Sequence, residues 1–241
     1  VTASGIEDYG NGWYRCWMTF TSDSADTSGA LRIYVAEGDG DFTVDLDGTS
    51  SIFVWGAQLE AGAFPTSYIP TTTASVTRNA DDVSTTDVSW YNEVGGTLYA
   101  EVVWLGGSGN VGASREAVSL GTTILNTMNV GRFAVDSRAL AGMRKTVANT
   151  LTVASIFDDT DAHRLVLGAS ANDMEFYADG TRSGTGDQTD VEMPTSITNM
   201  TIGNRQGGSG AEWNGLIKEI RYYGQRFPDP TLLNLSLGQF P

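Results

Sequence analysis

The chain has 241 residues, a formal net charge of −15 and a single cysteine, Cys16. Phosphate binding needs clustered Lys and Arg, so this charge argues against nucleic acid as a ligand. No run of about 18 apolar residues occurs, which argues against membrane insertion. One cysteine allows neither an intrachain disulfide nor a thiolate zinc site within the chain. The length permits one large β-sandwich or two smaller modules.

The first strand candidates lie between residues 31 and 55. Apolar and polar residues alternate over 31–35 and 42–46, as expected for strands with one buried face. Residues 52–55, Ile-Phe-Val-Trp, form a continuous apolar run, as expected for a strand covered on both faces. Asp47-Gly48 is typical of a turn between strands. Together these segments predict an antiparallel meander.

Two prolines, Pro65 and Pro70, then interrupt the strand pattern, and three threonines follow them. Prolines stiffen the chain and favour extended backbone, so this stretch is interpreted as ordered rather than as a floppy linker. The sequence therefore predicts a first module over residues 1–75, an ordered connector over 76–89 and a second module over 90–241.

The second module shows a longer series of strand candidates, at residues 98–105, 116–120, 128–135, 150–157, 164–167, 174–177, 200–202 and 216–223. In the last of these the apolar register slips by one residue. The slip predicts either a bulge near Lys218-Glu219 or an inward-facing, ion-paired Glu219. Asp229 as a cap, Pro230 at the first position and Gly238 beyond the end predict one short helix over 230–237. The expected fold class is all-β, an antiparallel β-sandwich or jelly roll.

Several motifs in residues 12–81 form a series. They read Gly-Trp-Tyr-Arg at 12–15, Ile-Phe-Val-Trp-Gly-Ala-Gln-Leu-Glu-Ala-Gly at 52–62, Pro-Thr-Ser-Tyr-Ile-Pro-Thr at 65–71 and Val-Thr-Arg-Asn-Ala-Asp at 76–81. This series resembles one in phage structural proteins, mainly tail fibres and tail-associated adhesins, where it closes a carbohydrate-binding-module-like jelly roll. A jelly roll needs about eight strands, and residues 1–70 offer only about four or five. The resemblance therefore implies the C-terminal part of such a module, completed by upstream residues or by another chain.

Residues from Trp90 onward resemble the concanavalin A-like, laminin-G-like sandwich. The resemblance is carried by Gly-Thr-Leu-Tyr-Ala-Glu at 96–101, Phe-Tyr-Ala-Asp-Gly at 176–180, Ile-Gly at 202–203 and Trp-Asn-Gly-Leu-Ile-Lys-Glu-Ile at 213–220. It implies a complete lectin-like sandwich that ends in the short helix.

Sugar binding by sandwich proteins uses aromatic faces that stack on pyranose rings, with polar groups that orient the sugar. We expect Trp104 and Trp213 to be surface residues that contact a glycan, with Tyr177 and Arg205 as further ligand-binding candidates. The remaining tryptophans are assigned to the core of the first module or, for the last of them, to packing between modules: Trp13, Trp17, Trp55 and Trp90.

Calcium is the metal for which the sequence offers ligands, because hard cations prefer carboxylate oxygens. Asp39 and Asp41 are the candidate ligands, with solvated turn aspartates as the alternative interpretation, since their spacing does not match an EF-hand. His163 is the single histidine, which excludes a two-histidine metal site. No other cofactor is expected.

Carboxylates for catalysis stand singly in the predicted strands, at Glu101, Glu116 and Glu219. Retaining glycosidases need two carboxyl groups about 5 Å apart. The Glu-x-Asp-x-x-Glu triplet of sandwich-fold glycosidases does not occur in the sequence. We therefore expect a protein that is not an enzyme, while distant strands leave a sandwich-fold glycosidase or lyase as an alternative.

The function that the resemblances imply is that of a non-enzymatic phage virion protein with a structural or adhesion role. Its expected partners are a glycan or cell-surface polysaccharide and other virion subunits, with a homotrimer as one form of assembly. Nucleic acid and membrane insertion are not expected. The expected location is the virion, in a tail or fibre, or alternatively the extracellular space. A free carbohydrate-binding module of a polysaccharide-degrading system is the alternative function.

Overall fold

The computed structural model describes residues 1–23, 25, 28–34, 40, 51–62, 64–77, 83–105, 114–133, 138–145, 148–153 (backbone only), 157, 159, 161–183, 190–206 and 212–240. The chain divides into two compact units, Val1–Thr77 and Arg78–Pro241. Each unit is described by itself.

The first unit contains one hairpin, formed by β1 (Ala3–Gly10) and β2 (Trp13–Thr19). Its turn residues Asn11 and Gly12 have φ angles of 54° and 81°, the left-handed geometry that favours Asn-Gly between two strands. Arg15 on β2 donates a hydrogen bond to the carbonyl of Thr66, which ties the hairpin to residues 64–77. The structure assigns no strand to residues 31–34 or 52–55, and residues 42–46 lie outside the described residues.

No described side chain of the first unit is buried. Phe53 is 84% exposed, Trp55 is 72% exposed and Leu59 is 87% exposed, although folding normally removes such side chains from water. A strand also needs a hydrogen-bonded neighbour. The apolar run at 52–55 has no such partner among the described residues and is not a strand. The described residues of the first unit therefore present apolar surface and form no buried core among themselves.

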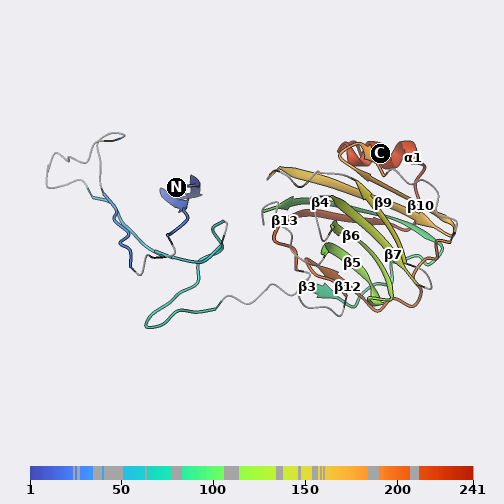
Figure 1. Ribbon diagram of the computed structural model, residues 1–241, viewed down its shortest axis with the longest axis horizontal. Helices are drawn as coiled ribbons and strands as arrows, with labels where there is room; N and C mark the ends of the chain where they lie inside the picture. The colour runs from blue at the N-terminus through green and yellow to red at the C-terminus, as the bar shows by residue number, and fades with distance from the viewer. Residues whose placement is uncertain are drawn as a thin grey trace. The chain divides into compact units, whose positions relative to one another are not determined.

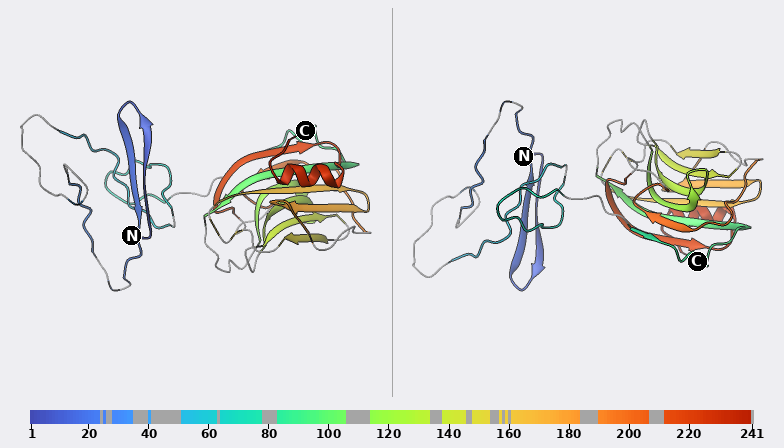
Figure 2. Two further views of the ribbon diagram at one scale, coloured as in Figure 1. Left: turned by 90° about the horizontal axis from the view of Figure 1, so that it is seen from above. Right: turned by 90° about the horizontal axis from the view of Figure 1, so that it is seen from below.

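The second unit is a two-layer antiparallel β-sandwich, which confirms the fold class (Figures 1 and 2). One sheet has the order β11-β10-β9-β4-β13 and the other has the order β3-β12-β5-β6-β7-β8. The strands of the first sheet are β4 (Gly95–Trp104), β9 (Ala162–Ser170), β10 (Asp173–Ala178), β11 (Thr181–Arg182) and β13 (Gly215–Tyr223). Those of the second are β3 (Val83–Thr85), β5 (Arg115–Thr123), β6 (Asn126–Arg132), β7 (Ala139–Arg144), β8 (Ala148–Val153) and β12 (Asn199–Ile202). Because β3 pairs with β12, the sandwich includes residues that the sequence assigned to the connector.

The core lies between the two sheets and follows the two-residue period of the strands. Leu98, Ala100 and Val102 alternate along β4 and are 0% exposed. They belong to one cluster with Val118 and Leu120 of β5, which are equally buried. The predicted bulge is confirmed, since the register of β13 against β4 shifts between Ile217 and Glu219.

The helix α1 (Asp229–Ser236) covers the outer face of the five-stranded sheet, as Figure 1 shows. Leu232 and Leu235 pack in one cluster with Tyr99, Val166 and Tyr177. The helix matches its predicted position, but Asp229 makes no side-chain cap hydrogen bond, because Pro228 occupies the N-cap position. No helix in the described part of the chain is long and apolar enough to cross a membrane.

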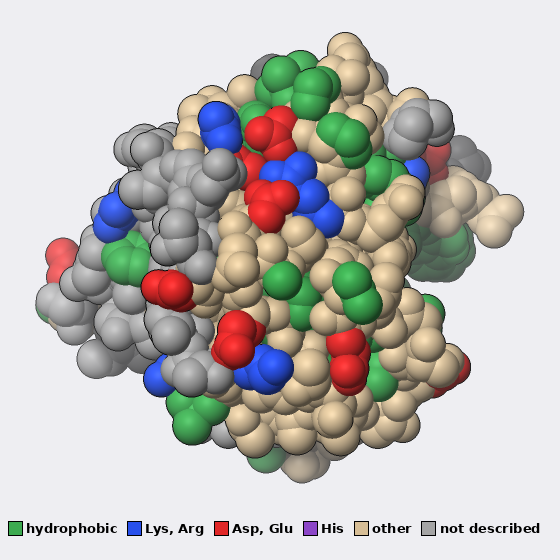
Figure 3. All heavy atoms as spheres, turned by 90° about the vertical axis from the view of Figure 1, so that its right-hand side faces the viewer, with side chains coloured by type: hydrophobic (Ala, Val, Ile, Leu, Met, Phe, Trp, Pro, Cys, Tyr) green, Lys and Arg blue, Asp and Glu red, His purple; other side chains and the backbone are tan. Residues whose placement is uncertain are grey.

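Charged side chains fasten the helix region to the sheet. Glu175, on β10, has no exposed side-chain surface and accepts hydrogen bonds from Arg182, with 2.7 Å from Nε to Oε2. Arg182 also lies 3.7 Å from Asp229, and Arg226 forms a 2.8 Å ion pair with Asp173. On the molecular face drawn in Figure 3, some acidic and basic side chains lie next to one another, while other acidic side chains stand apart.

Candidate functional site

The aromatic candidates from the sequence lie largely in the interior. Trp104 is 2% exposed and Tyr177 is 6% exposed, so neither ring presents an open face. Trp213 is half-buried, stacks edge-on against Trp104 at 5.3 Å between ring centroids, and donates its indole N–H to the carbonyl of Val103. The guanidinium of Arg132 lies 4.9 Å from the Trp104 ring centroid. These rings therefore close one end of the core.

The proposed calcium ligands Asp39 and Asp41 lie outside the described residues. Within the described ranges, no three His, Cys, Asp or Glu side chains gather to hold a metal ion. His163 contacts two carboxylates instead: Nδ1 lies 2.7 Å from Asp179 and Nε2 lies 3.0 Å from Asp159. Burial lowers the pKa of His163, but these two carboxylates raise it more, so its pKa lies above the ordinary value. The contacts of protonated His163 with these two carboxylates thus stabilise the fold at acidic pH. Their contribution fades as pH rises through the pKa of His163.

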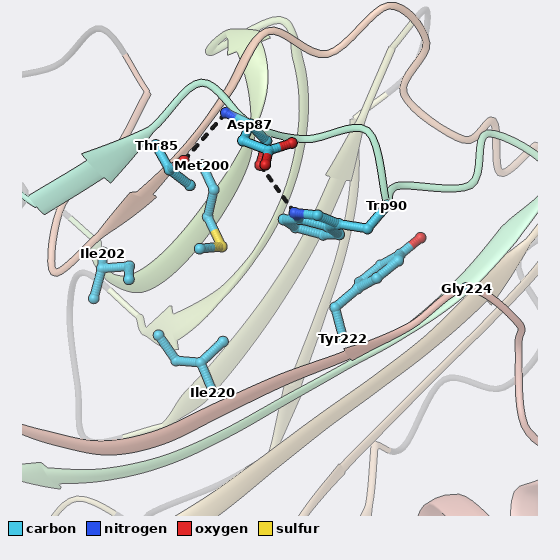
Figure 4. Close-up of a pocket in the computed structure, with 8 residues that line it drawn as sticks. All are labelled: Thr85, Asp87, Trp90, Met200, Ile202, Ile220, Tyr222 and Gly224. Carbon is cyan, nitrogen blue, oxygen red and sulfur yellow. Dashed lines mark hydrogen bonds between the residues drawn. The ribbon is translucent and has the colours of Figure 1, made fainter.

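A cleft of about 740 Å³ opens in the second unit between the sheet edges (Figure 4). One side is β13, the edge strand of the five-stranded sheet, and the other is β3 with its neighbour β12. Ligand pockets in proteins typically measure about 300–1,000 Å³. The lining residues are Thr85, Asp87, Trp90, Met200, Ile202, Ile220, Tyr222 and Gly224.

An aromatic wall, Trp90 with Tyr222, forms one side of the cleft. The two ring centroids lie 5.0 Å apart at an interplanar angle of 54°. Trp90 remains 40% exposed, and its indole N–H donates to the carbonyl of Asp87 at 2.9 Å. The Tyr222 hydroxyl accepts a 3.2 Å hydrogen bond from the Asn92 backbone N–H. Both rings are therefore held in place while one of them keeps surface open to solvent.

An aliphatic floor, Met200, Ile202 and Ile220, completes the apolar lining: Ile220 lies beside Tyr222 on β13, and Met200 and Ile202 come from β12 (Figure 4). Met200 pairs with Thr85 and Ile202 pairs with Val83 in the sheet register, so each floor residue of β12 shares the inner face with its partner. Two polar residues, Thr85 and Asp87, and Gly224 complete the lining. The arrangement offers a ligand one aromatic side, one aliphatic side and a small polar edge.

Sequence reasoning missed Trp90 as a site residue and assigned it to packing between modules. Its signal was local: Trp90 lies within a turn, closed by the 3.0 Å bond from the Tyr91 N–H to the Val88 carbonyl, whereas Trp104 ends a long, largely apolar strand. A tryptophan in a polar turn is more readily exposed than one that continues a buried strand. The pairing of Trp90 with Tyr222 has no local signal, because 132 positions separate them.

Arg205, the remaining predicted ligand residue, lies near a buried carboxyl group on the outer face of the six-stranded sheet. Glu116 is 3% exposed, and burial raises its pKa to about 7, against opposing hydrogen bonds from Asn129 and Ser119 and the charge of Arg205. Among the described residues, Glu116 Oε2, Asn129 Oδ1 and Arg205 Nε have no hydrogen-bond partner. Perturbed carboxyl groups often mark functional sites, but this one has almost no surface for a ligand to reach.

Glu116→Gln is expected to make stability less dependent on pH. The folded pKa is about 7 and the ordinary value is 4.5, so the wild-type protein loses stability as pH rises from 4.5 to 7 and does not recover it above. One pKa unit corresponds to about 1.4 kcal/mol, so the variant should gain about 3 kcal/mol relative to the wild type between these limits. Urea unfolding at pH 4.5 and pH 8 measures the free energy of unfolding of both proteins. A difference between the two proteins that is the same at both pH values would contradict the raised pKa of Glu116.

Two of the carboxylates considered for catalysis are neighbours. Glu101 on β4 and Glu219 on β13 are register partners. Glu101 lies 3.2 Å from Arg164 and 3.8 Å from Lys218, and Glu219 lies 2.6 Å from Arg221. The sequence did not reveal this juxtaposition, because the two strands are more than a hundred residues apart. Each carboxylate nevertheless has its own cationic partner, as in a surface ion-pair network.

Comparisons with known proteins identify similar solved structures. No family model and no curated protein matches the chain. The leech intramolecular trans-sialidase matches with a TM-score of 0.52 and 17% identity, over 66% of this chain and 26% of the leech chain. The CBM40 module of the Ruminococcus gnavus IT-sialidase matches with a TM-score of 0.49 and 18% identity, over 60% of this chain and 84% of that chain. Mouse laminin α1 domains LG4-5 match with a TM-score of 0.42 and 14% identity, over 62% of this chain and 44% of that chain.

These similarities concern the fold. The chain spans about a quarter of the length of the leech enzyme, and the identities are low. The other neighbours include a carbohydrate-binding module of a sialidase, a pentraxin and laminin G domains. The two antiparallel sheets of the second unit form a β-sandwich, a fold that the leech enzyme shares.

Proposed function

We propose that this protein is a glycan-binding module and that the sugar binds in the cleft between β13 and the β3-β12 edge. The observation that carries the proposal is the exposed ring of Trp90, which is fixed at the cleft by its indole hydrogen bond and backed by Tyr222. Sugars bind proteins through the stacking of their apolar C–H face on an aromatic ring. A ring already held in place loses little freedom on binding, which favours affinity.

The polar residues of the cleft lie where they can orient sugar hydroxyl groups. Thr85 Oγ1 accepts a 3.1 Å hydrogen bond from the Asp87 backbone N–H, and Asp87 Oδ1 accepts one of 2.9 Å from Ser89. These bonds hold the turn, and a carboxylate can accept more than one hydrogen bond. Asp87 therefore supplies a positioned acceptor beside the aromatic wall.

Trp90→Ala tests the proposed function. It is expected to weaken glycan binding about tenfold or more, because loss of a central stacking residue removes upwards of about 1.4 kcal/mol. Trp13→Ala is the matched control, since Trp13 is 48% exposed but belongs to the first unit. A glycan array followed by titration calorimetry on the best ligands gives the comparison. Equal affinities of both variants and the wild type would contradict the cleft as the binding site.

We infer that the protein binds glycans without cleaving them. Support comes from the ion pairs of Glu101 and Glu219, which give each carboxylate a cation, and from the nearly complete burial of Glu116. Glycoside hydrolysis requires one carboxyl to act as acid and a second to act as base or nucleophile beside the bound sugar. Incubation with a polysaccharide panel should release no reducing ends; release that Glu101→Gln abolishes would overturn this inference.

The biological setting that we propose is a phage virion, in a tail or fibre, with other virion subunits as partners. The proposal rests on the motif series at residues 12–81 and fits the apolar surface of the first unit, since large exposed apolar patches mark interaction sites. Labelling of purified virions with an antibody against the second unit, together with the mass of the protein in solution, tests it. A monomer that is absent from virions would favour a free extracellular module.

A further inference from the structure

We propose that the cleft selects neutral sugars that carry a methyl group, as in an acetamido or a 6-deoxy sugar, with the methyl group against the aliphatic floor. The inference rests on the proposed glycan binding at the same cleft. It follows from the distribution of apolar, polar and charged groups among the eight lining residues (Figure 4).

The floor offers no strong hydrogen-bonding group. Met200, Ile202 and Ile220 end in methyl groups, with a thioether sulfur as the one weak acceptor. All three are half-buried, and Met200 and Ile220 pack against the core cluster. A hydroxyl group placed here would give up water without a replacement partner, whereas a methyl group would leave water favourably. The floor therefore favours a methyl group over a hydroxyl group at the same position.

The aromatic wall of Trp90 and Tyr222 is also short of free donors. The Trp90 indole N–H is used by the Asp87 carbonyl, and the Tyr222 hydroxyl is engaged with the Asn92 backbone. What remains for a ligand is the face of the rings, which suits the C–H face of a pyranose. Thr85 and Asp87 can then form hydrogen bonds with the sugar hydroxyl groups. These bonds fix which side of the sugar faces the floor.

Charge narrows the ligand class further. Among the described residues that line the cleft, Asp87 is the single charged one, and none is Lys or Arg. A carboxylate or sulfate on the sugar would face Asp87 without a compensating cation in the lining, and like charges in a partly desolvated site repel. The net charge of −15 adds to this repulsion. The cleft therefore disfavours acidic sugars.

Titration of the full chain with matched pairs of methyl glycosides tests the selectivity. L-fucose against L-galactose isolates the 6-deoxy methyl group, and N-acetylglucosamine against glucose isolates the acetamido group. At least one methyl-bearing sugar is expected to bind about tenfold more tightly than its partner, and which pair responds identifies the source of the methyl group. Glucuronic acid is expected to bind more weakly than glucose.

A pair of floor variants links the selectivity to the cleft. Ile202→Val keeps an apolar floor, while Ile202→Thr replaces one methyl group of that valine by a hydroxyl at nearly the same volume. The preference should survive Ile202→Val and shrink in Ile202→Thr. If the two sugars of each pair bind equally and Trp90→Ala abolishes binding, the proposed selectivity is overturned while the proposed glycan binding stands. Binding that Trp90→Ala leaves unchanged would overturn both.

Discussion

Residues 1–77, expressed alone, are expected to show no cooperative unfolding transition and to associate or bind hydrophobic dyes. The described part of this unit has no buried side chain, and Ile6, Phe53 and Leu59 are all more than 70% exposed. Leaving a large apolar side chain in water forgoes roughly 1.5–3 kcal/mol. A handful of such side chains rivals the whole stability of a domain, about 5–15 kcal/mol.

The matched control is the second unit, residues 78–241, which has a closed core of its own. Thermal melts followed by near-ultraviolet circular dichroism should show one cooperative transition for this fragment and none for residues 1–77. A monomeric, cooperatively melting fragment 1–77 would contradict the argument. If fragment 1–77 shows no such transition, the apolar surface of the first unit requires cover from another polypeptide segment or subunit.

Arg182→Ala is expected to destabilise the second unit by about 3–5 kcal/mol, because it leaves a buried carboxylate without its cation. Glu175 has no exposed side-chain surface, and Arg182 is its hydrogen-bonded partner. Loss of Arg182 also removes the 3.7 Å contact to Asp229 at the start of α1. Urea unfolding monitored by fluorescence measures the change.

Two controls separate the ion pair from other effects of the substitution. Arg144→Ala removes an exposed arginine of β7 and should change stability by less than about 0.5 kcal/mol. The double variant Glu175→Met with Arg182→Met removes both charges and should recover most of the lost stability, since apolar replacement of a buried pair is often neutral. A double variant as unstable as Arg182→Ala would assign the loss to packing.

Local patterns in the sequence located most strands of the second unit, but not β3, β7 and β11. Alternation along β4 places Leu98, Ala100 and Val102 in the core. Asp179-Gly180, a dipeptide typical of hairpin turns, joins β10 to β11 with φ angles of 46° and 78°. The helix and the bulge at Glu219 also follow from nearby residues. In each case the physical cause lies within a few residues of its effect.

The candidate site could not be read in the same way, because it depends on which strands meet. Trp104 lies inside the sandwich because β4 is a central strand between β9 and β13. The sequence of β4 alone does not predict this central position in the sheet. Trp90 lines a cleft since β13 and β3 end the two sheets. The run at 52–55 predicted a strand, and strand formation needs a partner that local sequence does not specify.

The strands at two of the sheet edges are short. β11 contributes only Thr181–Arg182 to one sheet, and β3 contributes only Val83–Thr85 to the other. An incoming strand would find few free backbone groups there, so these edges are poor templates for edge-to-edge aggregation. Copies of the second unit can therefore be crowded closely together, as on a multivalent surface, with little risk that their sheets fuse at these two edges. Such crowding would let weak sugar contacts add up to firm attachment.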